Sequence, residues 1–425
     1  MILEIRLSNF FSIKDEIVLD LRAGSIKTKK AQDLQSNTFA YKDGQILKSV
    51  AIFGANASGK SNIIKAIRMC CSMVLASHNH NENTTFGNLS FKFENFPNKE
   101  SKFYIRFVMN SDEYEYSFSF IRNEYVTEEL YYYPNGRRAK IFTRNETNGK
   151  EKNKIYTFGA IIRKPMDVAE NTSRKTLFVS RASQMDRDFA KEVFNFFHAT
   201  FILDYSQYYN IHTEKLYKEN RDSLLKALKI ADSDIVNILS RKEPLPTKIF
   251  QIPDMKNQPL INDTISLPVQ DEIFVQLFFS TFHKANEKIA FNLYEEESAG
   301  TQKLFNMMLS IIDIVKNNKI LLIDEIENSL HSKIVAYIIE LFHTSNSAQI
   351  IYTTHNTNLL NLSKLRKDQI YFVNKRDDGS SDLYSLFDYK DFRDTMDVEK
   401  AYLQGRFEAI PYLNDSVENL KTLVQ

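Results

Sequence analysis

Eight residues near the N-terminus have the types and spacing of a phosphate-binding loop. Residues 54–61 read Gly-Ala-Asn-Ala-Ser-Gly-Lys-Ser and match the Walker A pattern G-x-x-x-x-G-K-[ST]. The glycines let the backbone curl so that its N–H groups face phosphate oxygens, and the helix that follows adds the positive end of its dipole. Lys60 would reach the β- and γ-phosphates of ATP, and the Ser61 hydroxyl would ligate Mg²⁺. The residues expected to bind nucleotide here are Gly54, Asn56, Ser58, Gly59, Lys60, Ser61 and Asn62.

The elements around this loop favour a functional motif over a chance glycine turn. Residues 47–53 form an apolar run that reads as a buried strand. Residues 62–69 carry apolar side chains at helical spacing. A strand, the motif and a helix therefore follow one another in the order that a phosphate-binding loop requires.

A pair of carboxylates follows an apolar strand in the C-terminal part of the chain. Residues 319–323 read Lys-Ile-Leu-Leu-Ile and end in Asp324 and Glu325, which is the Walker B pattern. Asp324 would hold Mg²⁺ through its waters, together with Ser61. Glu325 would polarise the attacking water as the catalytic base.

A histidine ends a second apolar strand nearby in sequence. Residues 349–355 read Gln-Ile-Ile-Tyr-Thr-Thr-His, so His355 also falls just past a buried run. Ligands bind beyond the carboxyl ends of the strands in parallel α/β sheets. We therefore expect His355 to contact the γ-phosphate side and to act in catalysis with Glu325 and Lys60; the alternative is a structural histidine.

A Ser-x-Gly turn before an amphipathic helix predicts a second anion-binding helix terminus. Residues 297–303 read Glu-Ser-Ala-Gly-Thr-Gln-Lys and lead into the apolar run 304–309. One γ-phosphate site rarely needs two such termini. We therefore expect Ser298, Gly300 and Thr301 to close on ATP bound to another subunit, the alternative being an N-capped helix without a ligand.

The distance between the two Walker motifs predicts a head domain built from both ends of the chain. Asp324 lies 270 positions after Gly54 (324 − 54), and we expect the two motif strands to lie side by side in one sheet. A compact nucleotide-binding domain does not need so many residues between them. We therefore divide the chain into an N-terminal lobe (1–180), a helical insert or arm (181–290) and a C-terminal lobe (291–425).

The middle of the chain should hold partners rather than hydrolyse nucleotide. Residues 101–158 alternate between apolar and polar types and predict a β-meander. Its aromatic residues could stack on bases, but they fall on the buried parity of each strand, which favours core packing. Residues 181–250 have helical patterns, including a helix over roughly 221–240.

The composition limits the class of protein. The 425 residues carry a net charge of +1, which argues against DNA as the main partner. Only two cysteines occur, adjacent in sequence, and they predict buried free thiols in a reducing, cytoplasmic compartment. No signal peptide and no run of about 20 apolar residues is found, so we expect a soluble protein without a membrane partner.

Taken together, these motifs resemble those of the ABC-type ATPases of the SMC, RecF and OLD kind. Residues 7–12, Leu-Ser-Asn-Phe-Phe-Ser, are similar to the N-terminal signature of that group, and residues 298–301 to a degenerate ABC signature. Residues 327–331, Glu-Asn-Ser-Leu-His, occupy the D-loop position, and His355 that of the switch histidine. The resemblance implies an α/β P-loop NTPase head of ABC type, built from both ends of the chain, that hydrolyses ATP with Mg²⁺ as an oligomer.

Within this superfamily the chain resembles the stand-alone ATPases of the RloA, AbiL and AriA group. Residues 402–411, Tyr-Leu-Gln-Gly-Arg-Phe-Glu-Ala-Ile-Pro, are similar to the ending of that group. The resemblance implies a nucleotide-dependent sensor or regulator of a bacterial anti-phage, abortive-infection system with a phage trigger. Its partner would be a separate toxic effector, often a TOPRIM-like nuclease.

The chain departs from the family patterns at several points. Ala299 stands where transporters keep Gly, Glu297 stands where they keep an apolar residue, and no Q-loop glutamine can be placed. Only 70 residues follow His355 (425 − 355), too few for the TOPRIM domain of OLD nucleases. We therefore predict no intrinsic nuclease.

Two other functions share the same motifs. A nucleotide-gated scaffold would assemble into a dimer or ring, with hydrolysis incidental to it. A RecF-like DNA-repair ATPase would need a local basic surface, for which the candidates are Lys27, Lys29, Lys30, Arg137 and Arg138.

Overall fold

The chain forms two compact units. The computed structural model describes residues 1–26, 28–87, 89–231, 233–244, 275–328, 330–390, 392 and 396–410; Lys27, Ser329 and Pro411, named above, lie outside it, as does the side chain of Lys30. The head unit consists of Met1–Tyr208 with Ser310–Gln425, and the arm unit of Tyr209–Leu309. The lobe boundaries expected at 180 and 290 stay a prediction.

A six-stranded, mostly parallel sheet lies at the centre of the head unit. Its strand order is β11-β15-β16-β5-β17-β18, and only the β17–β18 pair is antiparallel. In chain order the strands are β5 (Ser49–Gly54), β11 (Phe201–Ile202), β15 (Ile320–Ile323), β16 (Gln349–Thr353), β17 (Ile370–Lys375) and β18 (Ser381–Ser385). All residues of β5, β15 and β16 are buried, since both faces of a parallel sheet are covered.

One strand separates the two Walker strands, which corrects our expectation that they lie side by side. β16 pairs in parallel with β15 on one edge and with β5 on the other. Three parallel strands bring their carboxyl ends to the same edge of the sheet, so the two motifs still meet across β16. The expected α/β fold built from both ends of the chain is confirmed.

A seven-stranded antiparallel sheet forms the second layer of the head unit. Its order is β10-β9-β8-β7-β6-β1-β2, so the N-terminal hairpin extends the meander. The strands are β1 (Ile2–Ser8), β2 (Ile17–Asp20), β6 (Ser101–Met109), β7 (Asp112–Ile121), β8 (Glu124–Tyr132), β9 (Ala139–Asn145) and β10 (Tyr156–Phe158). The meander expected over 101–158 is confirmed. Its aromatic residues are buried core residues, as the favoured interpretation expected; they include Phe103, Phe107, Tyr116 and Phe118.

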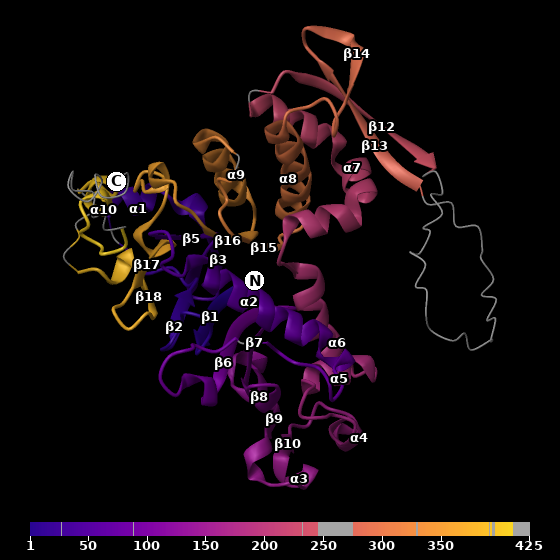
Figure 1. Ribbon diagram of the computed structural model, residues 1–425, viewed down its shortest axis with the longest axis vertical. Coiled ribbons are helices and arrows are strands. Elements are labelled where there is room, and N and C mark those ends of the chain that lie inside the picture. The colour runs from indigo at the N-terminus through magenta and orange to yellow at the C-terminus, as the bar shows by residue number, and fades with distance from the viewer. Residues whose placement is uncertain are drawn as a thin grey trace, which may run out of the picture. The chain divides into compact units, whose positions relative to one another are not determined.

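Helix α2 (Lys60–Ala76) joins the two sheets of the head unit into one core. Its apolar residues belong to the same buried cluster as residues of the antiparallel sheet and of β5, β15, β16 and β17. Figure 1 shows α2 between the labels of the two sheets. Both cysteines, Cys70 and Cys71, are free and fully buried in this helix. The helix that carries the phosphate-binding lysine is therefore held from both sides.

Shorter elements complete the head unit. The helices are α1 (Lys29–Asp33), α3 (Lys152–Ile155), α4 (Pro165–Glu170), α5 (Phe178–Gln184), α6 (Asp188–Asn195), α9 (Ser332–Thr344) and α10 (Val398–Leu403), and β3 (Thr38–Tyr41) pairs with β4 (Gly44–Leu47). In the part of the chain that the structure describes, no helix has the length and apolar character to cross a membrane.

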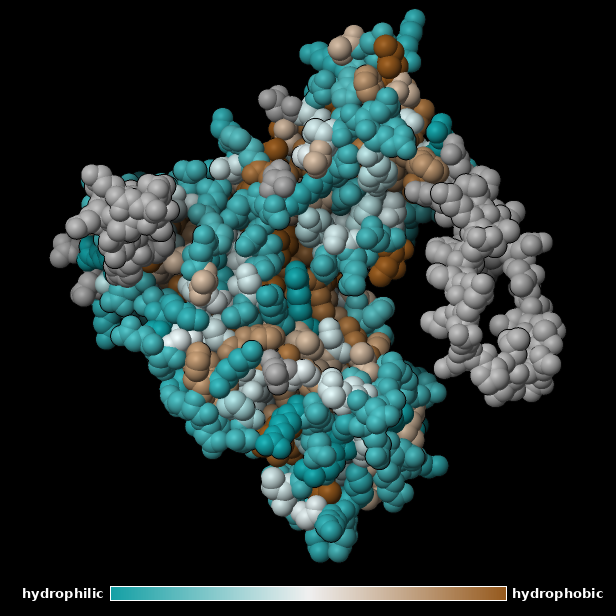
Figure 2. Space-filling model, in the orientation of Figure 1, coloured by the Kyte–Doolittle hydropathy of each residue, from teal (hydrophilic) through white to brown (hydrophobic). Residues whose placement is uncertain are grey.

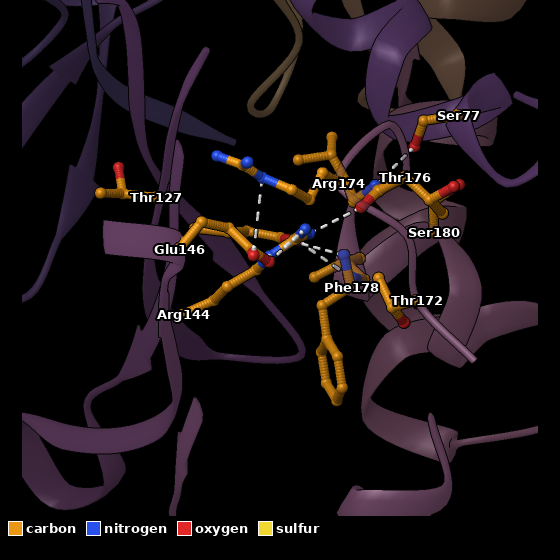
Figure 3. A network of polar contacts seen from close by, with 12 residues as sticks. Ser77, Thr127, Arg144, Glu146, Thr172, Arg174, Thr176, Phe178 and Ser180 are labelled. Carbon is orange, nitrogen blue, oxygen red and sulfur yellow. Dashed lines mark hydrogen bonds and ion pairs between the residues drawn. The ribbon is translucent and has the colours of Figure 1, made fainter. Parts of the chain in front are cut away.

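A buried polar network attaches the antiparallel sheet to α5. Glu128 accepts hydrogen bonds from the backbone N–H groups of Phe178 and Val179, at the start of α5, and from the Tyr116 hydroxyl. The fully buried Arg144 lies 3.7 Å from the Glu128 carboxylate and donates to the backbone oxygens of two residues before α5. Figure 3 shows Arg144 and Glu146 pointing toward the segment that contains Thr176 and Phe178.

The arm unit contains most of helix α7 (Tyr205–Ile230), a three-stranded antiparallel sheet and the start of helix α8 (Ala299–Lys316). The sheet has the order β12-β13-β14, with β12 (Ile235–Pro244), β13 (Val275–His283) and β14 (Asn286–Asn292). Phe279 of β13 packs between Tyr217 of α7 and Phe305 of α8, with ring centroids 4.9 and 5.0 Å away.

The helix expected over residues 221–240 was wrong in its second half. α7 ends at Ile230, and residues from Ile235 onward form β12. Ile235 and Ile238 are buried while Val236 and Leu239 are exposed, and the register of β12 against β13 shifts between Ile235 and Asn237. Pairing with β13, a contact distant in sequence, therefore decided the conformation of this stretch.

Candidate nucleotide-binding site

The loop between β5 and α2 ends in a residue, Gly59, whose position requires glycine. Gly59 precedes α2 and has a left-handed conformation with a φ of 111°. A Cβ atom there would lie 2.0 Å from the Ser381 hydroxyl and 2.6 Å from the Ser12 hydroxyl. The loop is thus packed closely from behind, and its backbone N–H groups begin helix α2 as the motif requires.

Lys60 is buried within the loop that it follows. Its ammonium group donates hydrogen bonds of 2.8 Å to the backbone oxygens of Gly54 and Ala55. Burial lowers the pKa of Lys60 to about 8, against the opposing charges of nearby carboxylates. Ser58 presents a buried hydroxyl with no hydrogen-bond partner among the described residues. A lysine desolvated in this way gains most from an anion such as a phosphate.

Two side chains that offer oxygen ligands for Mg²⁺, Ser61 from the N-terminal part of the chain and Asp324 from the C-terminal part, lie in contact. The Ser61 hydroxyl donates a hydrogen bond of 3.1 Å to Asp324, which directly follows β15. Asp324 also accepts a 2.6 Å hydrogen bond from the Thr353 hydroxyl at the end of β16. A hydroxyl and a carboxylate match the oxygen ligands that Mg²⁺ prefers. These residues therefore fit the metal that a Walker site uses.

Glu325 and His355 lie beside each other at this edge of the sheet. Glu325 has a left-handed backbone with a φ of 51°, and its N–H donates to the Thr353 hydroxyl at 2.8 Å. The Nε2 atom of His355 lies 4.0 Å from the Glu325 carboxylate. Burial, and then the charge of Lys60, lower the pKa of His355, so its imidazole is neutral at neutral pH. The pair can orient and polarise a water molecule.

Residues behind the loop were missed by the sequence reasoning. The Ser381 hydroxyl, on β18, donates to the backbone oxygen of Ser58 at 2.5 Å and lies 2.7 Å from the Ser12 hydroxyl. The Asn62 side-chain amide also donates to Ser12, at 2.8 Å. Neither Ser381 nor Thr353 stands in a pattern that marks it in the sequence.

The N-terminal signature acts through its last residue. Asn9 is buried and hydrogen-bonded to the backbone of residues 91, 96 and 99, which gives it a structural role. Ser12, three residues later, reaches the phosphate-binding loop through Asn62 and Ser381. The motif thus connects the antiparallel sheet to the loop.

The residues of the degenerate signature belong to the arm unit. Ser298 accepts a 3.1 Å hydrogen bond from the N–H of Thr301, the geometry of an N-cap at the start of α8, and the two hydroxyls lie 2.9 Å apart. Ser298 is exposed and Gly300 half-buried. Ser298, Gly300 and Thr301 are therefore not among the residues that the head unit itself brings together.

The carboxylate of Glu297, directly before the signature, is hydrogen-bonded to His283. Glu297 accepts from His283 Nε2 at 2.7 Å and from the Thr281 hydroxyl, both on β13. The other ring nitrogen of His283 lies 2.9 Å from Asp234, before β12. His283 thus connects the residue next to the signature with the beginning of the arm sheet.

Comparison with protein families identifies the head. Residues 49–361 match the family described as "AAA domain, putative AbiEii toxin, Type IV TA system". This chain belongs to that AAA-domain family. The match begins at the first residue of the Walker A strand and ends after His355, so it includes the Walker A, Walker B and signature residues and His355, but not Ser12 or Ser381. Membership confirms the P-loop ATPase type of fold. The RloA, AbiL and AriA group stays a prediction.

Solved structures with a similar fold include three SMC heads. One is an SmcHead bound to the C-winged helix domain of ScpA, with 18% identity, a TM-score of 0.42, and 95% of this chain and 99% of that chain covered. The SMC head domain from Thermotoga maritima has 15% identity, a TM-score of 0.40 and coverages of 90% and 98%. The Smc head domain with an extended coiled coil, bound to the C-terminal domain of ScpA and derived from Pyrococcus furiosus, has 17% identity and a TM-score of 0.40. The match covers 96% of this chain and 99% of that chain. No curated protein matches this AAA-domain chain.

Proposed function

We propose that this chain is an ATPase that binds ATP with Mg²⁺ and acts as a nucleotide-dependent regulator of a separate toxic effector in a bacterial anti-phage system. One observation carries the ATPase part. The head unit gathers Lys60, Ser61, Asp324, Glu325 and His355 at one edge of the parallel sheet, although they come from both ends of the chain. Membership of the AAA-domain family supports the same reaction.

The residues of the chain divide the work of hydrolysis. Lys60 leaves the carbonyl oxygens of its own loop for the phosphates, where its charge offsets the negative charge of the transferred group. Ser61 and Asp324 would hold Mg²⁺, which neutralises phosphate charge when bound. Glu325 accepts a proton from the attacking water, and the His355 imidazole beside it orients that water.

Turnover after a single substitution tests this assignment. Glu325→Gln should leave ATP affinity within about threefold of wild type and reduce kcat by roughly 10²–10⁴, the usual contribution of a general base. Glu340→Gln, at an exposed carboxylate of α9, is the matched control and should turn over ATP normally. Unchanged turnover in Glu325→Gln removes this residue from the role of base.

We also propose that the active form is at least a head-to-head dimer in which Ser298, Gly300 and Thr301 act on the nucleotide of the other subunit. Their support is chemical: Ser298 is exposed before the N-terminus of the long helix α8, and its hydroxyl and that of Thr301 lie 2.9 Å apart in the first turn. A mixture of Lys60→Ala and Ser298→Arg proteins tests it. Each alone should be inactive, and mixing should restore turnover, because mixed dimers keep one intact site. No recovery in mixed dimers contradicts action in trans.

The arm unit is the part that we propose to hold the effector. Its exposed apolar residues support this role: Ile211, Ile230, Val236, Leu239 and Ile289. Figure 2 shows apolar colour at the surface near β14. We propose that the chain works in the cytoplasm, has no nuclease activity of its own and does not have DNA as its main partner. Co-purification of the chain with the product of its neighbouring gene tests the pairing, and nuclease activity should appear only in that complex.

The same variants distinguish a regulator that needs hydrolysis from a nucleotide-gated scaffold. If Glu325→Gln keeps the effector bound as long as ATP is present, binding alone is the switch. If this variant fails to release the effector after a trigger that releases it from wild type, hydrolysis is required.

A further inference from the structure

Glu327 has no role in the scheme above, yet it contacts one of the proposed catalytic residues. It lies three positions after Asp324, in the turn between β15 and α9. Its Oε1 atom accepts a 2.5 Å hydrogen bond from the backbone N–H of His355. Thr353 binds the same turn, because its backbone oxygen accepts from the N–H of Ile326 and its hydroxyl from that of Glu325. The segment after Walker B is thus hydrogen-bonded along the end of β16.

The second oxygen of this carboxylate makes Glu327 unusual. Its Oε2 atom is buried and has no hydrogen-bond partner among the described residues. The Tyr352 hydroxyl is also buried and has no partner in the described part of the chain, and burial together with the charge of Glu327 raises its pKa. Buried polar atoms in native proteins are nearly always satisfied, so an unsatisfied carboxylate oxygen in a catalytic cluster needs a reason. Packing alone would be served better by an apolar residue.

We infer that Glu327 is a positioning residue for His355. By holding the backbone N–H of His355, Glu327 sets where the imidazole stands relative to Glu325, which lies 4.0 Å away. The hydrogen bond from the His355 N–H needs an acceptor oxygen at the position of Glu327 Oε1, but this oxygen need not carry a negative charge. This inference rests on the proposed ATPase function, because it deepens the description of the same site. A displacement of about 1 Å at a reacting group can cost about 10² in rate.

Two substitutions in the full-length chain separate an acceptor from a charge. Glu327→Gln keeps a carbonyl oxygen and should retain kcat within about threefold of wild type. Glu327→Ala removes the acceptor and should lower kcat at least about tenfold, while KM and the affinity for a non-hydrolysable ATP analogue change less than about threefold. Glu340→Ala on α9 is the matched control and should leave kcat unchanged. If glutamine loses as much activity as alanine, or if alanine loses none, the inference is overturned.

A second measurement does not depend on turnover. The chain has eight histidines, so protein labelled with ¹⁵N-histidine gives few backbone amide signals, and His355→Gln identifies the signal of His355. Glu327→Ala should move that signal upfield, because a bond to a carboxylate is lost, and Glu327→Gln should move it less. An unchanged signal in folded Glu327→Ala contradicts the inference. A wild-type protein without turnover would instead contradict the proposed ATPase, whatever this signal does.

Discussion

Tyr402 of the C-terminal tail lies against Phe53, the residue directly before Gly54 of the phosphate-binding loop. The two ring centroids are 6.5 Å apart at an interplanar angle of 62°. Tyr402 and Phe407 both stack on Phe372 of β17, at 5.6 and 4.7 Å. On the other side of the tail, Glu399 accepts a 2.7 Å hydrogen bond from Thr357, two residues after His355. The segment from Glu399 to Phe407 therefore packs against the strand that leads into the phosphate-binding loop and is hydrogen-bonded to the segment that follows His355.

Truncation of the tail core should weaken the head and its nucleotide site together. Phe407 is 1% exposed, so Phe407→Ala should cost about 3–5 kcal/mol of unfolding free energy. ATP affinity should fall as well, because Phe372 and Phe53 lose their support. Urea unfolding and analogue titration measure the two effects. Leu403→Ala, at a residue that is 59% exposed in the same motif, should stay within about 0.5 kcal/mol. Equal losses for both variants would mean that the packing described here is not what stabilises the tail.

Substituting one member of the buried pair Arg144 and Glu128 should lower the free energy of unfolding more than expected from replacing both residues together with apolar ones. Arg144 is fully buried between Glu128 and Glu146, so Arg144→Ala leaves two buried carboxylates without their guanidinium and should destabilise by about 3–5 kcal/mol, whereas Glu128→Ala leaves Arg144 paired with Glu146 and should cost less. Changing both residues to apolar ones of similar volume should cost less than the sum of the single changes (Figure 3). A double-mutant cycle by urea unfolding measures the difference. Lys154→Ala, at an exposed residue that pairs with the exposed Glu151, should cost at most about 1 kcal/mol.

The arm sheet should become less stable as the pH rises through the folded-state pKa of His283. The imidazole of His283 faces the carboxylates of Asp234 and Glu297, the hydroxyl of Thr281 through Glu297, and the ring of Phe291. Burial works against its charged form, but the two carboxylates raise the pKa of His283 above its ordinary value of 6.5. A raised folded-state pKa gives stability that is complete below about 6.5 and is lost as the pH passes the folded value.

Hydrogen exchange across this pH range measures the effect. After correction for intrinsic rates, protection of β13 and of the start of α8 should fall with rising pH in wild type. His283→Gln should show low protection that hardly depends on pH between about 6 and 9. A pH-dependence that persists in His283→Gln assigns it to another group.

ATP binding should take up a proton at alkaline pH. The pKa of Lys60 is lowered to about 8 by burial in its loop, and a polyphosphate would raise it again. At a pH of about 8.5 Lys60 is neutral in most molecules, so that it takes up a proton when ATP binds. The affinity for ATP should therefore fall as the pH increases further. Calorimetry in buffers of different ionisation enthalpy measures the number of protons. Lys60→Arg, whose side chain stays charged, should show no uptake; uptake equal to wild type places the proton elsewhere.

The sequence by itself was sufficient to predict the residues whose roles depend on local chemistry. Gly59 is required by one backbone conformation, and Lys60 and Ser61 follow it within one helical turn. The apolar runs before Asp324 and His355 predicted buried strands, because a parallel sheet covered on both faces admits little else. The large gap between the motifs correctly predicted a head built from both ends of the chain.

Only the tertiary structure decided which distant segments meet. The sequence reasoning missed that β16 stands between the Walker strands, that Thr353 and Ser381 support the site, and that Glu327 holds His355. The stretch after Ile235 has an apolar pattern that was read as helical, and its pairing with β13 made it a strand. The spacing of residue types along the chain indicates the local helix or strand. The order of strands in a sheet and the hydrogen bonds between loops depend instead on contacts between residues that are hundreds of positions apart in the sequence.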